Sequence, residues 1–342
     1  MSKRHPGIIY HKIGAKRDGT LTAVEVKYIL DSGAYATLSP VVLWRGTVHA
    51  AGPYRVPNVK VDSFAIATNK VPCGAFRGFG SPQVIFATES QMDILAEALS
   101  MDPAELRLKN LVRDGDEMPF GHMLRGSTGA VDALKLVLKA SDWKKYPETE
   151  GFKKRGIGLS TLFYGVGLGA GGKYLARTGA YIQITEDAKA VFAVGTTEMG
   201  QGMKTVLTQI VAEELGLPYE DVSMLPVDTS RVPDSGPTVA SRATVMSGNA
   251  LRKAAKPLKK KLLRIAREML KDNGPVRFGD GWVYLHNEKK IPLKDVIKEA
   301  YNRREHMASQ GFYVSPPTSW DEEKGGEAYM TYAWAAKVAE VE

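Results

Sequence analysis

Cysteine is almost missing from this 342-residue chain, which carries a single one, Cys73. One thiol excludes a disulfide framework, and it also excludes an iron–sulfur cluster or structural zinc held by cysteines of this chain. Such sparse use is typical of a reducing cytoplasm, where we expect the protein to reside. The sequence also lacks a signal segment and any run of about eighteen apolar residues, so we expect no membrane partner.

Histidine is scarce as well, and its residues are scattered. The six are His5, His11, His49, His122, His286 and His306. None lies at metal-ligand spacing from another histidine or from clustered carboxylates, so we expect no metal ligand on this chain. The net charge of +8 is modest, and much of it falls between Lys253 and Arg267 without interleaved aromatic residues. This pattern is typical of a solvated helix face, and we expect no nucleic-acid partner.

Apolar periodicity indicates a mixture of strands and helices, and we predict an α+β fold with room for two or three domains. Strands are expected at 8–15, 21–30, 59–67, 156–163, 180–184, 190–194, 222–227 and, as a hairpin, 276–285. Helices are expected at 82–99, 103–111, 131–140, after 202 to 215, after 242 to 271, and 293–304. Residues 41–51 look less regular, and Pro257 should kink or split its helix. The polar stretch 141–154 predicts a boundary between domains 1–145 and 146–342.

Three glycine-rich loops stand out, at residues 72–83, 165–172 and 195–202. In the first loop, three glycines surround Arg77 and a proline then opens a helix. Free N–H groups at a helix start and a guanidinium both favour an anion, although an arginine in solvent is the plainer interpretation. The last loop also leads into a helix. Together the loops suggest a large anionic cofactor.

Residues 167–172 also fit the dinucleotide fingerprint G-x-G-x-x-G, which raises the alternative of a nicotinamide dehydrogenase. The fingerprint requires a helix directly after its glycines, whereas residues 181–184 alternate like a strand. A flexible or ligand-wrapping loop is therefore the better interpretation of this segment.

Residues 75–80, A-F-R-G-F-G, followed by 82–83, resemble the molybdopterin-loop motif of the xanthine dehydrogenase and aldehyde oxidase family. Residues 195–202, G-T-T-E-M-G-Q-G, resemble the second cofactor motif of that family. Residues 237–242 with 247–250 resemble the third. The matches follow the family order across nearly the whole chain.

The resemblance implies part of a large subunit, built of two mixed helix/sheet molybdopterin-binding domains and truncated at both ends. It implies a molybdenum-bearing pyranopterin, with or without a cytosine nucleotide, in the full-length enzyme. Iron–sulfur clusters and FAD are implied on other segments or partner subunits. The implied reaction is hydroxylation of an aldehyde or N-heterocycle carbon, with water as the oxygen source. By the same resemblance Gln201 bonds an oxygen at the metal centre. The other implied cofactor contacts are Phe76, Arg77, Gly78, Met199, Gly200, Val239, Ala240 and Ser241.

Two positions bear on the substrate. The run from Arg45 to Val59 matches the family stretch whose arginine lies over the substrate in xanthine-oxidising members, and Phe79 matches the aromatic that packs on the ring. Both favour a purine-like heterocycle, because a guanidinium there stabilises charge developing on a purine carbonyl. The alternatives are a surface salt bridge for Arg45, an aldehyde-oxidising member of the family, or a non-catalytic scaffold with the same fold.

The family pattern continues beyond residue 342, and its general base lies in that later part. We therefore expect this segment alone to fold, to be inactive and to carry no molybdenum. Residues 329–341 look like a strand cut off before its return partner, so we also expect some self-association through that edge.

Overall fold

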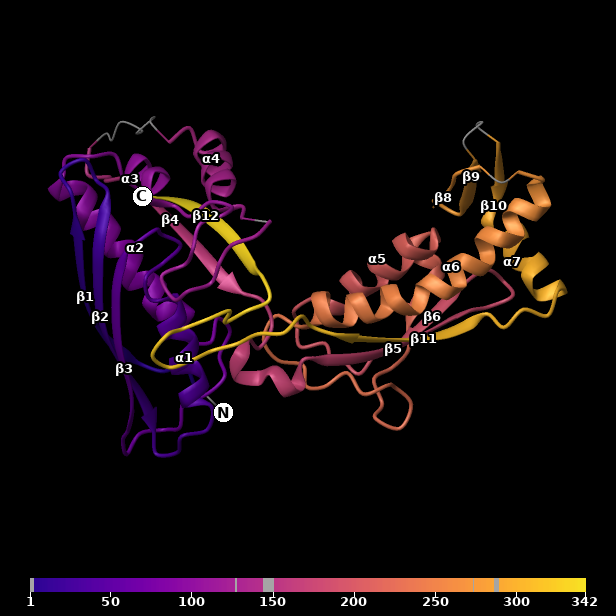
Figure 1. Cartoon of the computed structure of the whole chain (residues 1–342), viewed down its shortest axis with the longest axis horizontal. Helices are drawn as coiled ribbons and strands as arrows, with labels where there is room; N and C mark the ends of the chain where they lie inside the picture. The colour runs from indigo at the N-terminus through magenta and orange to yellow at the C-terminus, as the bar shows by residue number, and fades with distance from the viewer. Residues whose placement is uncertain (1–2, 127, 144–150, 273, 286–288) are drawn as a thin grey trace. The chain divides into compact units, whose positions relative to one another are not determined.

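The computed structural model describes residues 3–126, 128–143, 151–272, 274–285 and 289–342 (Figure 1). The chain forms two compact units: unit 1 comprises Met1–Gly171 and Thr318–Glu342, and unit 2 comprises Gly172–Pro317. The expected boundary between residues 145 and 146 lies outside the described residues. The mixture of helices and sheets confirms the predicted α+β class.

Unit 1 holds four helices and five strands in its described part. Its strands are β1 (Gly7–Ala15), β2 (Leu21–Gly33), β3 (Asn58–Ala67), β4 (Gly156–Gly165) and β12 (Tyr332–Val341). Its helices are α1 (Ser39–His49), α2 (Ser81–Ala98), α3 (Pro103–Asn110) and α4 (Ala130–Ala140), and the 3₁₀ segment η1 (Ala170–Leu175) crosses the unit boundary.

Unit 2 contains the remaining elements. Its strands are β5 (Arg177–Ile184), β6 (Ala190–Ala193), β7 (Val222–Met224), β8 (Val276–Gly279), β9 (Trp282–Leu285), β10 (Lys290–Pro292) and β11 (Ala308–Val314). Its helices are α5 (Met203–Leu215), the 3₁₀ turn η2 (Tyr219–Asp221), the π-helical turn η3 (Ala243–Ser247), α6 (Gly248–Leu270) and α7 (Leu293–Asn302).

The first sheet of unit 1 has the order β1-β2-β3, with β1 antiparallel and β3 parallel to β2. Strand β2 alternates between residues 23 and 31, and Val24, Val26, Tyr28 and Leu30 are all buried on one face. Helices α1 and α2 cover that face, and the period of two in the sequence sets which residues enter the core. Asp102 caps α3 by accepting hydrogen bonds from two backbone N–H groups, as its position before a proline predicts.

A second, two-stranded sheet in unit 1 pairs β4 with β12 in antiparallel register, from Gly156 opposite Val341 to Gly165 opposite Tyr332 (Figure 1). The strand expected near residues 329–341 thus has one partner, β4, and among the described residues its other edge is unpaired, so self-association through that edge stays a prediction. The partner β4 lies far upstream in the sequence, where local patterns give no sign of the pairing.

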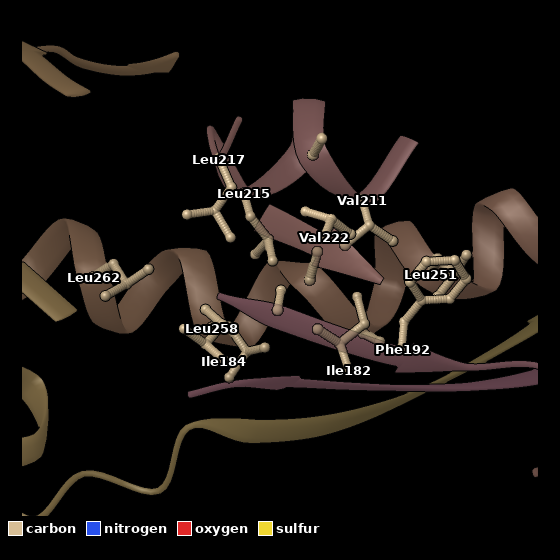
Figure 2. Close-up of a cluster of buried hydrophobic side chains, with 14 of the residues drawn as sticks. Ile182, Ile184, Phe192, Val211, Leu215, Leu217, Val222, Leu251, Leu258 and Leu262 are labelled. Atoms are coloured by element: carbon tan, nitrogen blue, oxygen red, sulfur yellow. The ribbon is translucent and has the colours of Figure 1, made fainter. Parts of the chain in front are cut away.

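Unit 2 is built on a four-stranded sheet of order β11-β5-β6-β7. Helices α5 and α6 lie on one face of it, and Figure 2 shows side chains of both helices meeting those of β5 and β6. Ile182, Phe192, Val211 and Leu258 are completely buried there. This core includes residues of β6 and α6. The second motif follows the end of β6, and the third motif leads into the start of α6.

Two elements differ from expectation. Residues 39–49 form helix α1 because tertiary packing buries Val42 and Arg45, which outweighs the irregular local pattern. Helix α6 continues through Pro257 without splitting. Pro257 is exposed, so the carbonyl that loses its partner faces water rather than the core.

Candidate functional site

The first glycine loop bends through three consecutive residues with positive φ before α2 begins. Gly78, Phe79 and Gly80 have φ of 94°, 51° and 98°. A Cβ at Gly80 would overlap the carbonyl oxygen of Val42, so glycine alone lets the loop reach helix α1. Pro82 then lies in the first turn of α2, where a missing N–H costs nothing. The loop is therefore fixed against α1 from its glycine side.

Arg4 braces the two residues that precede these glycines. Its guanidinium carbon lies 4.5 Å from the centre of the Phe76 ring, and its Nη2 donates to the carbonyl oxygen of Arg77 at 2.6 Å. The Phe76 and Arg77 side chains are exposed. Arg77 thus presents an exposed guanidinium on a loop whose backbone is held by the hydrogen bond from Arg4.

Arg45 does not lie on the surface, so the salt-bridge alternative for it is wrong. Its side chain is only 2% exposed and lies between the rings of Tyr164 and Tyr329, at 4.7 and 4.8 Å. Nη1 donates to the carbonyl oxygen of Gly165 at 3.0 Å, and Nη2 donates to that of Gly167 at 2.6 Å. The guanidinium therefore clamps the glycine loop that follows β4.

His49 grips the same loop one helical turn further along α1. Its Nε2 accepts a hydrogen bond from the backbone N–H of Gly165 at 3.1 Å, and its Nδ1 lies 2.7 Å from the carbonyl oxygen of Arg45. These two bonds assign the proton to Nδ1 and leave the ring neutral. Burial, reinforced by the charge of Arg45, lowers the pKa of His49 to about 3.

In the second cofactor motif, residues 197–202 are exposed, whereas Thr196 is buried. The Glu198 carboxylate accepts hydrogen bonds from the N–H groups of Gly200 at 2.8 Å, Gly202 at 3.0 Å and Lys204 at 3.2 Å, at the start of α5. These bonds, that from Lys204 first, lower the pKa of Glu198. The Glu198 carboxylate therefore bonds this loop to the start of α5.

Gln201 folds back onto the same loop. Its Oε1 accepts from the N–H of Met199 at 2.6 Å, and its Nε2 donates to the carbonyl oxygen of Thr197 at 2.9 Å. Both polar atoms of the amide are therefore engaged by backbone groups.

The third motif, together with Ser235 just before it, is bonded directly to the second within unit 2. The N–H of Gly195 donates to Oγ of Ser235 at 2.8 Å, and the N–H of Thr197 donates to Oγ1 of Thr238 at 2.9 Å. Ala240 takes a φ of 51°, which places a non-glycine residue in the left-handed region. The two motifs thus form one connected platform at the ends of β6 and α6.

The predicted residues fall into groups by location. Unit 1 holds Arg45, Phe76, Arg77, Gly78 and Phe79, and Phe79 is partly buried against the core of that unit. Unit 2 brings together Met199, Gly200, Gln201, Val239, Ala240 and Ser241. All of these are exposed except Ser241, which is half-buried.

Sequence reasoning missed the side chains that organise these loops. Glu198, Ser235, Thr238 and Arg242 all lie within or beside the recognised motifs, yet none was singled out. A dense run of Ser, Thr and acidic residues around glycines is the available signal, because such side chains bond neighbouring backbone N–H groups. Which N–H each one binds depends on the fold.

The described residues also bear on two other kinds of site, a metal centre and a membrane span. That part of the chain holds no group of three or more His, Cys, Asp or Glu residues arranged around a common point. None of its helices combines the length and apolar character that a bilayer crossing requires. His286 lies outside the described residues.

Comparison with known proteins decides the family. Two family models described as a molybdopterin cofactor-binding domain match residues 1–111 and 134–342. The chain belongs to the molybdopterin cofactor-binding family. Both matches contain glycine-bearing motifs recognised above, which confirms the resemblance drawn from those motifs.

Relatives of this family cover nearly the whole chain. The chain is 40% identical over 266 residues to a protein of Bacillus subtilis named as a probable xanthine dehydrogenase component, a match covering 78% of this chain and 35% of that protein. It is 30% identical over 349 residues to xanthine dehydrogenase of Emericella nidulans, covering 99% of this chain and 24% of that protein. An aldehyde oxidoreductase structure from Desulfovibrio gigas matches with a TM-score of 0.75 and 27% identity, covering 99% of this chain and 35% of that one. The chain thus spans about a quarter to a third of their length.

Proposed function

We propose that this chain is the cofactor-binding part of a molybdenum hydroxylase that acts on a purine-like N-heterocycle. Membership of the molybdopterin cofactor-binding family supports an oxidoreductase of this class. The observation that carries the proposal is the platform of unit 2, where two exposed loops are bonded together by Ser235 and Thr238. An exposed loop that is nonetheless ordered is what a preorganised ligand surface requires.

The residues present fit an anionic pterin. Arg77 offers a forked set of donors on a braced loop. In unit 2 the N–H groups of Met199 and Gly200 are bonded to Gln201 and Glu198, so those loops would bind the cofactor by exchanging such bonds for bonds to it. We propose cofactor contacts at Phe76, Arg77 and Gly78 and, in unit 2, at 199–201 and 239–241. When bound, the cofactor supplies the oxygen-transfer and electron-transfer chemistry. This chain's residues bind it, orient it and set the charge around it.

The role proposed for Gln201 fits its present bonds. Its Nε2 carries two hydrogens, of which one donates to the carbonyl oxygen of Thr197, and the other is left for an oxygen at the metal centre. The bond from Met199 to Oε1 fixes the amide in this orientation.

Arg45 and Phe79 carry the proposal on substrate. Arg45 uses two of its five N–H donors on Gly165 and Gly167 and is 2% exposed, so contact with a substrate carbonyl would require the packing of Tyr164 and Tyr329 around it to open. The relatives named as xanthine dehydrogenases support a purine. The aldehyde oxidoreductase of similar fold supports the alternative, an aldehyde.

We further propose that electrons leave through iron–sulfur and FAD subunits or domains in the cytoplasm. The Bacillus subtilis relative is named as one of several components of a xanthine dehydrogenase, which supports a multi-subunit assembly. The proposed pterin exists with or without a cytosine nucleotide, and mass spectrometry of the released cofactor distinguishes the two forms.

The deciding experiment is molybdenum and pterin analysis of the protein purified with its native partners. Equimolar molybdenum and pterin support the proposal, whereas a complete assembly that lacks both is a scaffold. Saturable NAD binding by residues 167–172 would instead favour a dehydrogenase.

The substrate is tested on the holoenzyme with Arg45→Ala, assayed on a purine and on a simple aldehyde. Loss of a charge-stabilising donor should lower kcat/KM for the purine by about 100-fold or more and leave the aldehyde much less affected. An equal loss on both substrates would show that Arg45 acts only by clamping residues 165–167.

A further inference from the structure

Arg242 gathers backbone carbonyls from two separate segments of unit 2. Its side chain is buried, with 4% exposed. Nη2 donates to Leu175 at 2.7 Å and to Arg177 at 3.0 Å, and it also lies 3.2 Å from the carbonyl oxygen of Ser235. Nη1 donates to the carbonyl oxygen of Pro237. The guanidinium therefore ties the third cofactor motif to the segment that enters β5.

The positive charge of Arg242 is not neutralised by an acid. Over the described residues, no carboxylate lies within 4.0 Å of its guanidinium nitrogens, although a buried arginine is ordinarily paired. The charge of Asp234 raises the pKa of Arg242, which opposes the effect of burial. Asp234 is exposed, however, and forms an ion pair with Arg177 at 3.5 Å. Carbonyl oxygens carry only partial charges, so the balance is incomplete.

One donor of this buried guanidinium also lacks an acceptor. Nε of Arg242 is buried and has no hydrogen-bond partner. A buried donor without an acceptor destabilises the folded state. Burial also removes water from the guanidinium, and this lowers the pKa of Arg242. A folded chain retains a buried, incompletely bonded charge of this kind where that charge serves a function.

The position of Arg242 in the sequence indicates that this function is cofactor binding. It directly follows Ala240 and Ser241, two residues of the proposed cofactor surface, and Ala240 is held at a φ of 51°. It also lies near the carbonyl of Ser235, whose hydroxyl accepts from Gly195 of the second motif. Ser235 thus links this arginine to the second motif.

We propose that Arg242 is a positioning residue that fixes the loop 235–241 and holds buried positive charge for an anionic phosphate group of a pterin cofactor. The inference rests on the proposed function. Arg242 acts through the loop: it sets the backbone that meets the ligand, and its charge favours an anion over a neutral ligand there.

The test compares the whole protein, purified with its native partners, with Arg242→Lys and Arg242→Met. Lysine keeps the charge but lacks the planar fork, and methionine keeps much of the volume without the charge. Arg252→Met is the matched control, because Arg252 is an exposed arginine of α6 that bonds the side chains of Glu214 and Asn249. Released pterin is measured by fluorescence, and amide hydrogen exchange is measured over residues 235–241.

We expect pterin content to fall about tenfold in Arg242→Met, which loses both the buried charge and the bonds to the loop, and less in Arg242→Lys, which keeps the charge. Exchange over 235–241 should accelerate in both variants, and the control should match the unchanged protein. If Arg242→Met does not fold, Arg242→Lys decides alone. Wild-type pterin content in a folded Arg242→Lys or Arg242→Met variant overturns the inference.

The two proposals fail separately. An unchanged protein without pterin contradicts the proposed function, whatever the variants do. Normal pterin in the unchanged protein and in the Arg242 variants, with faster loop exchange alone, contradicts only the inference and leaves Arg242 as a brace of the fold.

Discussion

Glu89 and Arg107 form a buried ion pair in unit 1, with 2.9 Å between Oε2 of the glutamate and Nε of the arginine. The same carboxylate accepts from the backbone N–H of Thr161 in β4 at 2.6 Å and from the hydroxyl of Tyr54. Arg107 also contacts Asp93 at 2.8 Å. One carboxylate thus joins α2, α3 and β4.

Removal of the Glu89 charge should therefore be costly. We expect Glu89→Gln to lower the free energy of unfolding by about 3 kcal/mol or more, because Arg107 stays buried with only half-exposed Asp93 as a charged partner. Chemical denaturation measures this, with Glu97→Gln on the exposed side of α2 as the control. The double variant Glu89→Leu/Arg107→Met should be less destabilised than the sum of its single changes, and strict additivity would contradict the coupling.

The stability of the protein should fall with acid because of His49. Its pKa is lowered from 6.5 to about 3, so between those values the unfolded chain binds a proton that the folded one does not. The contribution is present above pH 6.5 and is lost progressively as pH falls toward 3.

His49→Gln isolates this contribution, because the other lowered histidine pKa values, such as that of His11 at about 4, are common to both proteins. Between pH 6 and pH 4.5 the slope of unfolding free energy against pH should be about 1.4 kcal/mol per unit shallower in the variant. Equal slopes would show that His49 titrates normally in the folded state.

The Glu198 carboxylate should control the order of the second cofactor loop. In Glu198→Ala we expect faster hydrogen exchange at the amides of Gly200, Gly202 and Lys204, because their acceptor is removed. Glu198→Gln should retain part of the protection, and Glu213→Ala on the exposed face of α5 should change nothing there.

The same bonds give a pH dependence. The pKa of Glu198 is lowered from 4.5, so the bonds are intact above that value and are lost as pH falls through the folded pKa. Amide protection in the unchanged protein, corrected for intrinsic exchange, should fall in that acid range. Protection that persists through protonation would assign the order of the loop to other contacts.

Gly80→Ala should disrupt the first cofactor loop. The residue has a φ of 98°, and an added Cβ would overlap the carbonyl oxygen of Val42. Gly115→Ala is the matched control, because Gly115 has a similar φ of 88° but nothing within 4 Å. We expect thermal denaturation to show Gly80→Ala less stable than the control by about 2 kcal/mol, since the backbone strain is common to both. Equal losses would mean that strain alone accounts for the glycine.

Local sequence patterns predicted most of the fold and the location of the candidate loops. The alternation along β2 and the Asp102 cap of α3 are local properties, and both follow from the residues themselves. Helix α1 was missed because its formation depends on packing against the sheet. The pairing of β4 with β12 was missed because strand partners far apart in the chain leave no local pattern.

The site divides in the same way. Glycines with positive φ, such as Gly78 and Gly200, mark the loops, because backbone conformation depends on the residue itself. The target of the Arg45 guanidinium could not be read from the sequence, since its two acceptors are carbonyls that any residue supplies. The same holds for Arg242.

The pairing of β4 with β12 has a consequence for the order in which the protein forms. On the ribosome, residues 156–165 emerge long before residues 332–341, and all of unit 2 is synthesised in between. Unit 2 can therefore fold while the second sheet of unit 1 still waits for its other strand. Until β12 is synthesised, Leu159 and Phe163 of β4 lack the strand that pairs beside them. We therefore expect chaperones to bind most strongly to nascent chains that include β4 but not yet β12.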